Sequence, residues 1–192
     1  MIHSLYFDDY KDMSIYTTDA GLSERFKWRI RYYGDDLDYI VLEKKEKKEG
    51  RCHKKSCKIT IGEYHKIVSG DIMDIFYDTK KELIQELGKD MLVYGYVPKV
   101  IIDYERIAYV EEITNVRITF DMKISASNDL DSFLEGDYQK YYLQPSGQSV
   151  LEVKFDDILP SYIKNIVESY CFCQSSFSKY YYGRKIIDSY MR

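Results

Sequence analysis

The stretch Arg25-Phe26-Lys27-Trp28-Arg29-Ile30-Arg31-Tyr32 alternates strictly between cationic and apolar residues. Successive side chains of a β-strand point to opposite faces, so the sequence predicts a strand with its cations on one face. Neighbouring cations there would lie about 6.6 Å apart and repel one another by about 2.5 kcal/mol per pair at an effective dielectric of about 20. A single such strand can be a solvated face, but a row that faces an enclosed space requires an anion.

The same alternation recurs in predicted strands at 37–47, 53–61, 99–109, 115–125 and 150–155. Each places at least one cation where an alternating strand could have placed core residues. The residues that share a face in all these strands are Arg29, Arg31, Glu43, Lys45, Lys58, Tyr104, Arg106, Arg117, Glu152 and Lys154. If those faces converge, they cannot form a dry core, and we expect them to line an anion-binding channel.

The rest of the chain predicts an α+β fold in one domain over residues 1–192. Residues 1–7 read as a strand that either lies at an edge of the sheet or lacks a partner. Helices are expected at 62–69, at 79–89 with Thr79 as N-cap, from Pro160 to about Tyr170, and in the tail from Tyr181. Five or six strands in meander pairs favour an antiparallel β-barrel or a strongly curved sheet, with the helices packed outside.

Composition limits the classes of partner. The chain has 192 residues, of which 45% are hydrophobic and 16% aromatic, and its net charge is −4. A general nucleic-acid-binding domain is usually basic overall, so nucleic acid is not an expected partner. A concentrated basic surface within an acidic protein suits a small, highly charged ligand.

The cysteines and the hydropathy indicate the compartment. Cys52, Cys57, Cys171 and Cys173 lack the spacing of a zinc ribbon and are interpreted as reduced thiols. The sequence has no signal peptide and no apolar run long enough to span a bilayer, which predicts a cytoplasmic protein.

Two carboxylates, Glu43 and Glu152, fall among the cations of the shared face. Mg²⁺ and Mn²⁺ are commonly held by one or two carboxylates together with substrate phosphates, so these residues fit a metal-bound polyphosphate. The alternative is that each carboxylate pairs with a neighbouring cation.

Several short segments, which occur in the order of the family and cover nearly the whole chain, resemble one known family. They are Ser4-Leu5-Tyr6-Phe7-Asp8, Arg29-Ile30-Arg31-Tyr32-Tyr33-Gly34, Leu42-Glu43-Lys44-Lys45, Lys55-Ser56-Cys57-Lys58, Tyr104-Glu105-Arg106, Arg117-Ile118-Thr119-Phe120-Asp121, Leu151-Glu152-Val153-Lys154 and Ser178-Lys179-Tyr180. The family is the VTC domain, the polyphosphate polymerase domain of the vacuolar transporter chaperone complex and its bacterial relatives.

The resemblance implies a triphosphate tunnel metalloenzyme (CYTH-like) fold, an antiparallel barrel whose lumen binds triphosphate or polyphosphate with Mn²⁺ or Mg²⁺. It implies hydroxyl contacts from Tyr104 and Ser178 and a metal ligand in Glu152. The phosphate contacts that it implies are Arg29, Arg31, Lys45, Lys58, Arg106, Arg117, Lys154 and Lys179. Ser178 and Lys179 come from the resemblance alone. Family members carry a further strand before the Leu-Tyr-Phe-Asp word, so we expect an N-terminally shortened barrel.

Three functions follow from the resemblance. The first is a phosphotransferase that passes the γ-phosphate of ATP to a polyphosphate chain, with a membrane-complex partner left unidentified. The second is a triphosphatase on the same fold, and the third is a non-catalytic module that binds polyphosphate or nucleotide.

Overall fold

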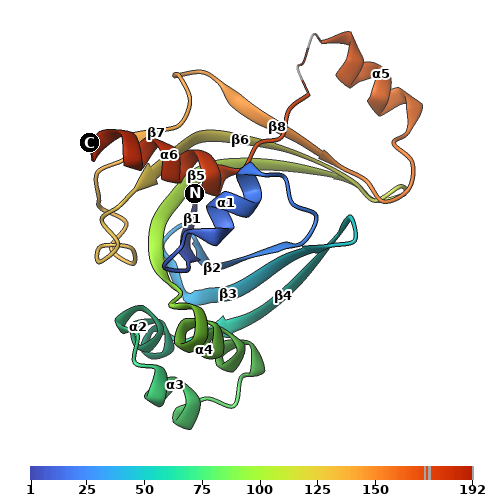
Figure 1. The fold of residues 1–192 in the computed structure, drawn as a ribbon. Helices are drawn as coiled ribbons and strands as arrows, with labels where there is room; N and C mark the ends of the chain where they lie inside the picture. The colour runs from blue at the N-terminus through green and yellow to red at the C-terminus, as the bar shows by residue number, and fades with distance from the viewer. Residues whose placement is uncertain (171, 173, 192) are drawn as a thin grey trace.

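The computed structural model describes residues 1–170, 172 and 174–191, which form a mixed α+β fold around one antiparallel sheet (Figure 1). The strands are β1 (Ile2–Asp8), β2 (Arg25–Tyr33), β3 (Asp36–Lys48), β4 (Arg51–Ile59), β5 (Val97–Glu111), β6 (Val116–Ser127), β7 (Tyr141–Tyr142) and β8 (Ser149–Lys154). The helices are α1 (Met13–Asp19), α2 (Ile61–Ser69), α3 (Ile72–Asp78), α4 (Glu82–Tyr94), α5 (Ser161–Ser169) and α6 (Lys179–Tyr190).

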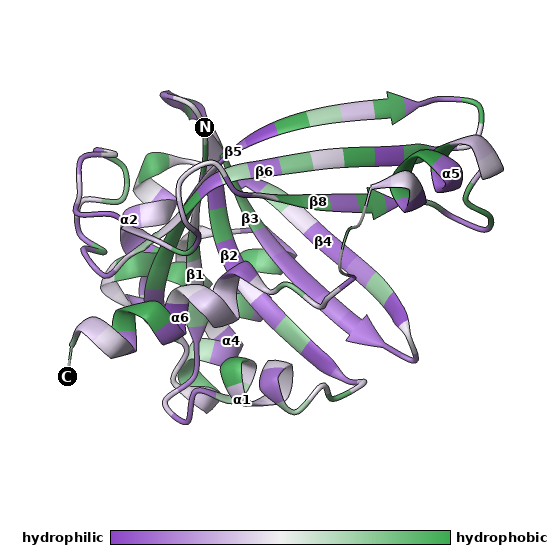
Figure 2. Ribbon diagram, turned by 90° about the horizontal axis from the view of Figure 1, so that it is seen from above, coloured by the Kyte–Doolittle hydropathy of each residue, from purple (hydrophilic) through white to green (hydrophobic). Residues whose placement is uncertain are grey.

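The sheet is open. Its strands run in the order β4-β3-β2-β1-β5-β6-β7, with β8 also paired to β6, and no pairing joins β4 to β8 within the described chain. In Figure 2 the strands β2–β4 on one side and β5, β6 and β8 on the other extend from β1 as two diverging wings. The predicted α+β antiparallel architecture is confirmed, in the form of a curved sheet whose edges do not meet.

Strand β1 lies at the centre of the sheet. It pairs with β2 on one side, where Tyr6 faces Arg29, and with β5 on the other, where Tyr6 faces Val100. All of its residues are buried. The prediction that this strand forms an edge is therefore wrong, because it has a partner on each side.

The apolar face of β2 packs against helices, as the alternation predicts. Trp28 and Ile30 are fully buried in a core with α2 and α4, and Trp28 Nε1 donates to Asp90 of α4 at 2.8 Å. Helix α2 begins with a capping box between Thr60 and Glu63. The predicted second helix begins three residues late, at Glu82, since Thr79 Oγ1 accepts from the backbone N–H of Lys81 instead of capping the helix.

Helices α6 and α1 do not follow the prediction that helices pack outside the sheet, because Ile15 of α1 packs against the same concave-face cluster as α6. Tyr180 and Ile187 pack with Ile102 of β5 and Ala126 of β6 on the cation-bearing concave face. A β-bulge permits this packing, because Lys123 has φ 50° and the pairing of β5 with β6 shifts between Asp103 and Glu105. The bulge places both Asp121 and Ile124 on the concave side.

Gly183 allows α6 to approach the sheet. A Cβ atom at this position would lie 2.2 Å from Cδ1 of Ile102, so Gly183→Val is expected to lower the free energy of unfolding by about 1–3 kcal/mol through overpacking. Urea denaturation measures the loss. Gly62→Val in α2, where only Thr60 Oγ1 lies within 4 Å of the new Cβ, should be near neutral, and equal losses in both variants would contradict the close approach.

None of the described helices is long and apolar enough to cross a membrane. Cys52 and Cys57 are free thiols, as predicted, whereas Cys171 and Cys173 lie outside the described residues.

Candidate functional site: a cationic cavity on the concave face

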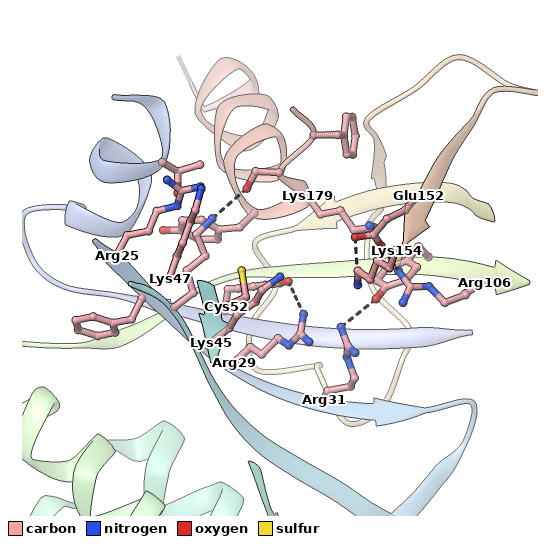
Figure 3. Close-up of a pocket in the computed structure, with 18 residues that line it drawn as sticks. Arg25, Arg29, Arg31, Lys45, Lys47, Cys52, Arg106, Glu152, Lys154 and Lys179 are labelled. Atoms are coloured by element: carbon pink, nitrogen blue, oxygen red, sulfur yellow. Dashed lines mark hydrogen bonds and ion pairs between the residues drawn. The ribbon is translucent and has the colours of Figure 1, made fainter. Parts of the chain in front are cut away.

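The concave face encloses a cavity of about 280 Å³ between β2 and β3 on one side and β5, β8 and the start of α6 on the other (Figure 3). Glu152 is the one carboxylate among the described residues that line it. The lining cations are Arg25, Lys27, Arg29, Arg31, Lys45, Lys47, Arg106, Lys154 and Lys179. Such an excess of positive charge in an enclosed space favours a polyanionic ligand.

Most of the predicted site residues line this cavity. They are Arg29, Arg31, Lys45, Tyr104, Arg106, Glu152, Lys154, Ser178 and Lys179. In Figure 3, Arg29 and Arg31 lie across the cavity from Glu152, Lys154 and Arg106. Alternation within each strand places the strand residues of this list on one face, and the start of α6 adds Ser178 and Lys179.

Lys58 and Arg117 share the concave face but do not line the cavity. Lys58 of β4 pairs with Val41 of β3, which in turn pairs with Arg31 of β2. The Nζ of Lys58 lies 5.8 Å from the centre of the Tyr39 ring. Arg117 pairs with Lys154 and is exposed. Alternation identifies the face of a residue, but it does not show how far along the strand the cavity extends.

Glu43 does not line the cavity, but it contacts Arg29, which does. It accepts a short hydrogen bond from Arg29 Nε and lies 3.5 Å from Lys54 Nζ, and its side chain is 6% exposed. Burial alone would raise the pKa of Glu43, but Arg29 and Arg31 outweigh burial and lower it. Glu43 is thus an ionised group that holds Arg29, which matches the ion-pair alternative of the sequence.

Asp121 is a second such group, and sequence reasoning did not select it. This fully buried carboxylate accepts from Arg106 Nε at 2.6 Å and Arg106 Nη2 at 2.7 Å, and it lies 2.5 Å from Lys179 Nζ. Arg106 and Lys179 lower the pKa of Asp121 against the effect of burial. The available signal was its place on the face of Arg117, opposite the predicted Arg106.

Arg31 has no carboxylate partner in the described part of the chain. Its guanidinium donates to Ser4 Oγ at 3.2 Å and to Tyr104 Oη at 2.9 Å, and the residue is 7% exposed. Neutral hydroxyls compensate a buried charge only in part. Arg31 is therefore a buried cation that no ion pair within the described residues neutralises.

Tyr6 lies on the cavity floor and accepts from Arg29 Nη1 at 3.1 Å. Burial would raise the pKa of the Tyr6 phenol, but Arg29 and Arg31 stabilise the phenolate more strongly and lower the pKa to about 8. The shifted pKa records the strength of the positive potential in the cavity.

Glu152 is the residue that fits a divalent metal ion. Its half-exposed carboxylate lies 3.2 Å from Lys154 Nζ and 3.8 Å from Arg106 Nη2. The described residues contain no cluster of three His, Cys, Asp or Glu side chains. One carboxylate suits Mg²⁺ or Mn²⁺ when phosphate oxygens and water complete the coordination. Glu43 fits less well, because its side chain is 6% exposed and does not line the cavity.

The comparison with protein-family models agrees with the sequence segments that resemble the VTC domain. The model of the VTC domain family matches residues 1–187. No curated protein matches the chain significantly. Among solved structures, the chain is similar to HpAC1 from Hippeastrum, a candidate adenylyl cyclase described as having a dominant triphosphatase activity. The two are 14% identical with a TM-score of 0.47, and the similarity covers 88% of this chain and 70% of that one. Because the family match spans nearly all of its length, the chain belongs to the VTC domain family.

Proposed function

We propose that this domain is a polyphosphate polymerase, a phosphotransferase that passes the γ-phosphate of ATP to a polyphosphate chain bound in the cationic cavity. The observation that carries the proposal is the cavity lining, in which Glu152 is the one carboxylate among the described residues and the buried Arg31 has no ion pair with any of them. Membership of the VTC domain family supports the same substrate class. A cytoplasmic location, proposed with it, accords with the free thiols of Cys52 and Cys57.

The cavity residues would act by positioning and by neutralising charge. Phosphoryl transfer has a loose transition state with negative charge on the equatorial oxygens, so fixed cations supply most of the catalysis. Arg29 and Arg106, held by Glu43 and Asp121, can each present a planar fork to a phosphate. Lys45, Lys154 and Lys179 supply point charges to neighbouring phosphates.

Hydroxyl groups and one carboxylate complete the assignment. Tyr104 and Ser178 offer hydroxyls to phosphate oxygens, and a phosphate acceptor is already an anion, so no general base is needed. Glu152 would hold the Mg²⁺ or Mn²⁺ ion. When bound, that ion neutralises the developing charge of the transferred phosphate. Lys58 and Arg117, outside the cavity on the same face, can bind a longer polyphosphate where it leaves the cavity.

Product analysis after incubation with ATP and Mn²⁺ separates the three possible functions. Chains of many phosphates are expected. Inorganic phosphate as the sole product would replace the polymerase with a triphosphatase. Tight binding of tripolyphosphate with no turnover of ATP would leave a binding module.

Arg31→Ala tests the cavity with little disturbance of the fold, because Arg31 holds no carboxylate. The variant is expected to bind tripolyphosphate more weakly by about 1.5–3 kcal/mol, the range for hydrogen bonds to charged groups. Calorimetric titration measures the affinity. Arg51→Ala is the matched control. Cys52 and Lys47 line the cavity, and Arg51, next to Cys52 on β4, lies on the opposite face of the sheet. An unchanged affinity in Arg31→Ala would exclude the cavity as the binding site.

A further inference from the structure

Lys27 is a cation of the cavity whose contacts within the described chain are neutral groups. It lies on β2 between Arg25 and Arg29, and its side chain points to the concave face. Its Nζ donates to Ser178 Oγ at 3.1 Å and lies 5.2 Å from the centre of the Tyr180 ring. No ion pair joins Lys27 to a carboxylate of the described chain.

Several other cations of the cavity have carboxylate partners. Arg29 has Glu43, and both Arg106 and Lys179 have Asp121. These pairs hold their cations in place without a ligand. Lys27 resembles Arg31, which also has only hydroxyl partners. Lys27 and Arg31 flank the ion-paired Arg29 along β2, and all three line the same cavity.

The groups around Lys27 come from each element that packs against it. They are Tyr6 and Asp8 of β1, Arg25 and Arg29 of β2, Lys45 of β3, and Ser178, Lys179 and Tyr180 at the start of α6. Burial is the main cause that lowers the pKa of Lys27 to about 8, with Arg25 and Lys45 adding to it, while Tyr6 and Asp8 oppose the shift. The protonated ammonium is therefore less stable in the cavity than in water.

We infer that Lys27 is a further phosphate-binding residue, whose ammonium exchanges the hydroxyl of Ser178 for a phosphate oxygen when a polyanion enters the cavity. The inference rests on the proposed function of the cavity. Ser178 keeps its place after the exchange, because its Oγ also accepts from the backbone N–H of Tyr181 as the N-cap of α6. Lys27 would thereby add a phosphate contact between those of Arg29 and the outer Arg25.

A dependence on pH follows from this exchange. A bound phosphate favours the protonated form of Lys27, so polyanion binding above about pH 8 takes up a proton, and the affinity falls as the pH rises through 8. Tyr6 acts in the same range, because its phenol, with a pKa of about 8, becomes an anion on the cavity floor. The contribution of Lys27 is therefore measured in proteins that carry Tyr6→Phe.

The experiment is calorimetric titration with tripolyphosphate at pH 7 and pH 9. Lys27→Met is expected to bind about tenfold to a hundredfold more weakly than the wild type at pH 7, the loss of one charge-assisted hydrogen bond. Its melting temperature should be equal or higher, because it removes a buried cation that has no carboxylate partner. Lys27→Arg should restore most of the lost affinity. Lys55→Met, on the opposite face where Lys55 pairs with Glu86, is the control.

The comparison of pH values isolates Lys27. Between pH 7 and pH 9, the affinity of Tyr6→Phe should fall more than that of the double variant Tyr6→Phe/Lys27→Arg, whose guanidinium stays charged. The titration of tripolyphosphate itself is common to both proteins and cancels. Equal falls, or wild-type affinity in Lys27→Met at pH 7, would overturn the inference while leaving the cavity as a polyanion site. No binding by the wild type would overturn the proposed function and the inference together.

Discussion

Asp121→Asn is expected to lower the free energy of unfolding by about 3–5 kcal/mol, because the carboxylate it removes is fully buried and holds two cations. Asparagine has nearly the same shape, so packing is preserved. It can still accept one hydrogen bond, but it brings no charge to Arg106 or Lys179. Urea denaturation without ligand measures the loss.

A polyanion should restore part of this stability. Tripolyphosphate can neutralise Arg106 and Lys179 in place of Asp121, so its addition is expected to raise the melting temperature of Asp121→Asn more than that of the wild type. Glu105→Gln is the control, because Glu105 pairs with Lys123 on the outer face at a half-exposed site, where the pair contributes at most about 1 kcal/mol. Equal losses of unfolding free energy in the two variants would show that Asp121 contributes no more to stability than the exposed carboxylate of Glu105.

Asp121 also contributes to the acid sensitivity of the protein. Its pKa in the folded state is lowered below the ordinary value of about 3.9. The stabilisation is therefore complete above about pH 4 and is lost as the pH falls through the folded-state pKa. The wild type and Asp121→Asn should converge in stability as the pH falls below about 4.

The period of two in a strand explains what could be predicted from the sequence. Arg29, Arg31, Lys45, Arg106 and Lys154 lie on one face because each occupies an alternate position of its strand. A cavity also requires this face to be concave, and alternation does not show whether a face of a sheet is concave. The recurrence of cations in several strands favoured a channel, and the curvature of the sheet provides a concave face whose edges do not meet.

The features that were missed depend on contacts between distant parts of the chain. The central place of β1 follows from its pairing with β5, about a hundred residues away, where Ile2 faces Tyr104. The bulge at Lys123 shifts the alternation of β6, so Ile124 can pack against α6. Lys179 was predicted, but only from the family resemblance, because it comes from a helix on the concave face and no strand pattern indicates it. The alternation of β6 places Asp121 on the same face as the cations. Only its contacts with Arg106 and Lys179 show that it holds these two side chains.

Glu152→Gln is expected to abolish the proposed metal-dependent turnover while preserving the binding of the polyanion. Burial alone would raise the pKa of Glu152, but Lys154, Lys179 and Arg106 lower it, so the carboxylate is ionised at neutral pH. Glutamine keeps the shape and removes the charge that a divalent ion requires. Since it also removes the one negative side chain lining the cavity among the described residues, tripolyphosphate should bind equally well or more tightly without metal.

Titrations with tripolyphosphate in the presence and absence of Mn²⁺ test this division of roles. The wild type should bind more tightly with Mn²⁺, and Glu152→Gln should show no such gain, while EDTA should reduce wild-type turnover to the level of the variant. Glu43→Gln is the informative comparison, because Glu43 lies beneath Arg29 and outside the cavity. Its loss should weaken polyanion binding through a displaced Arg29 but leave the gain from Mn²⁺ intact. If Glu43→Gln removes that gain and Glu152→Gln does not, the metal ligand is Glu43, and Arg29 must release it when the substrate binds.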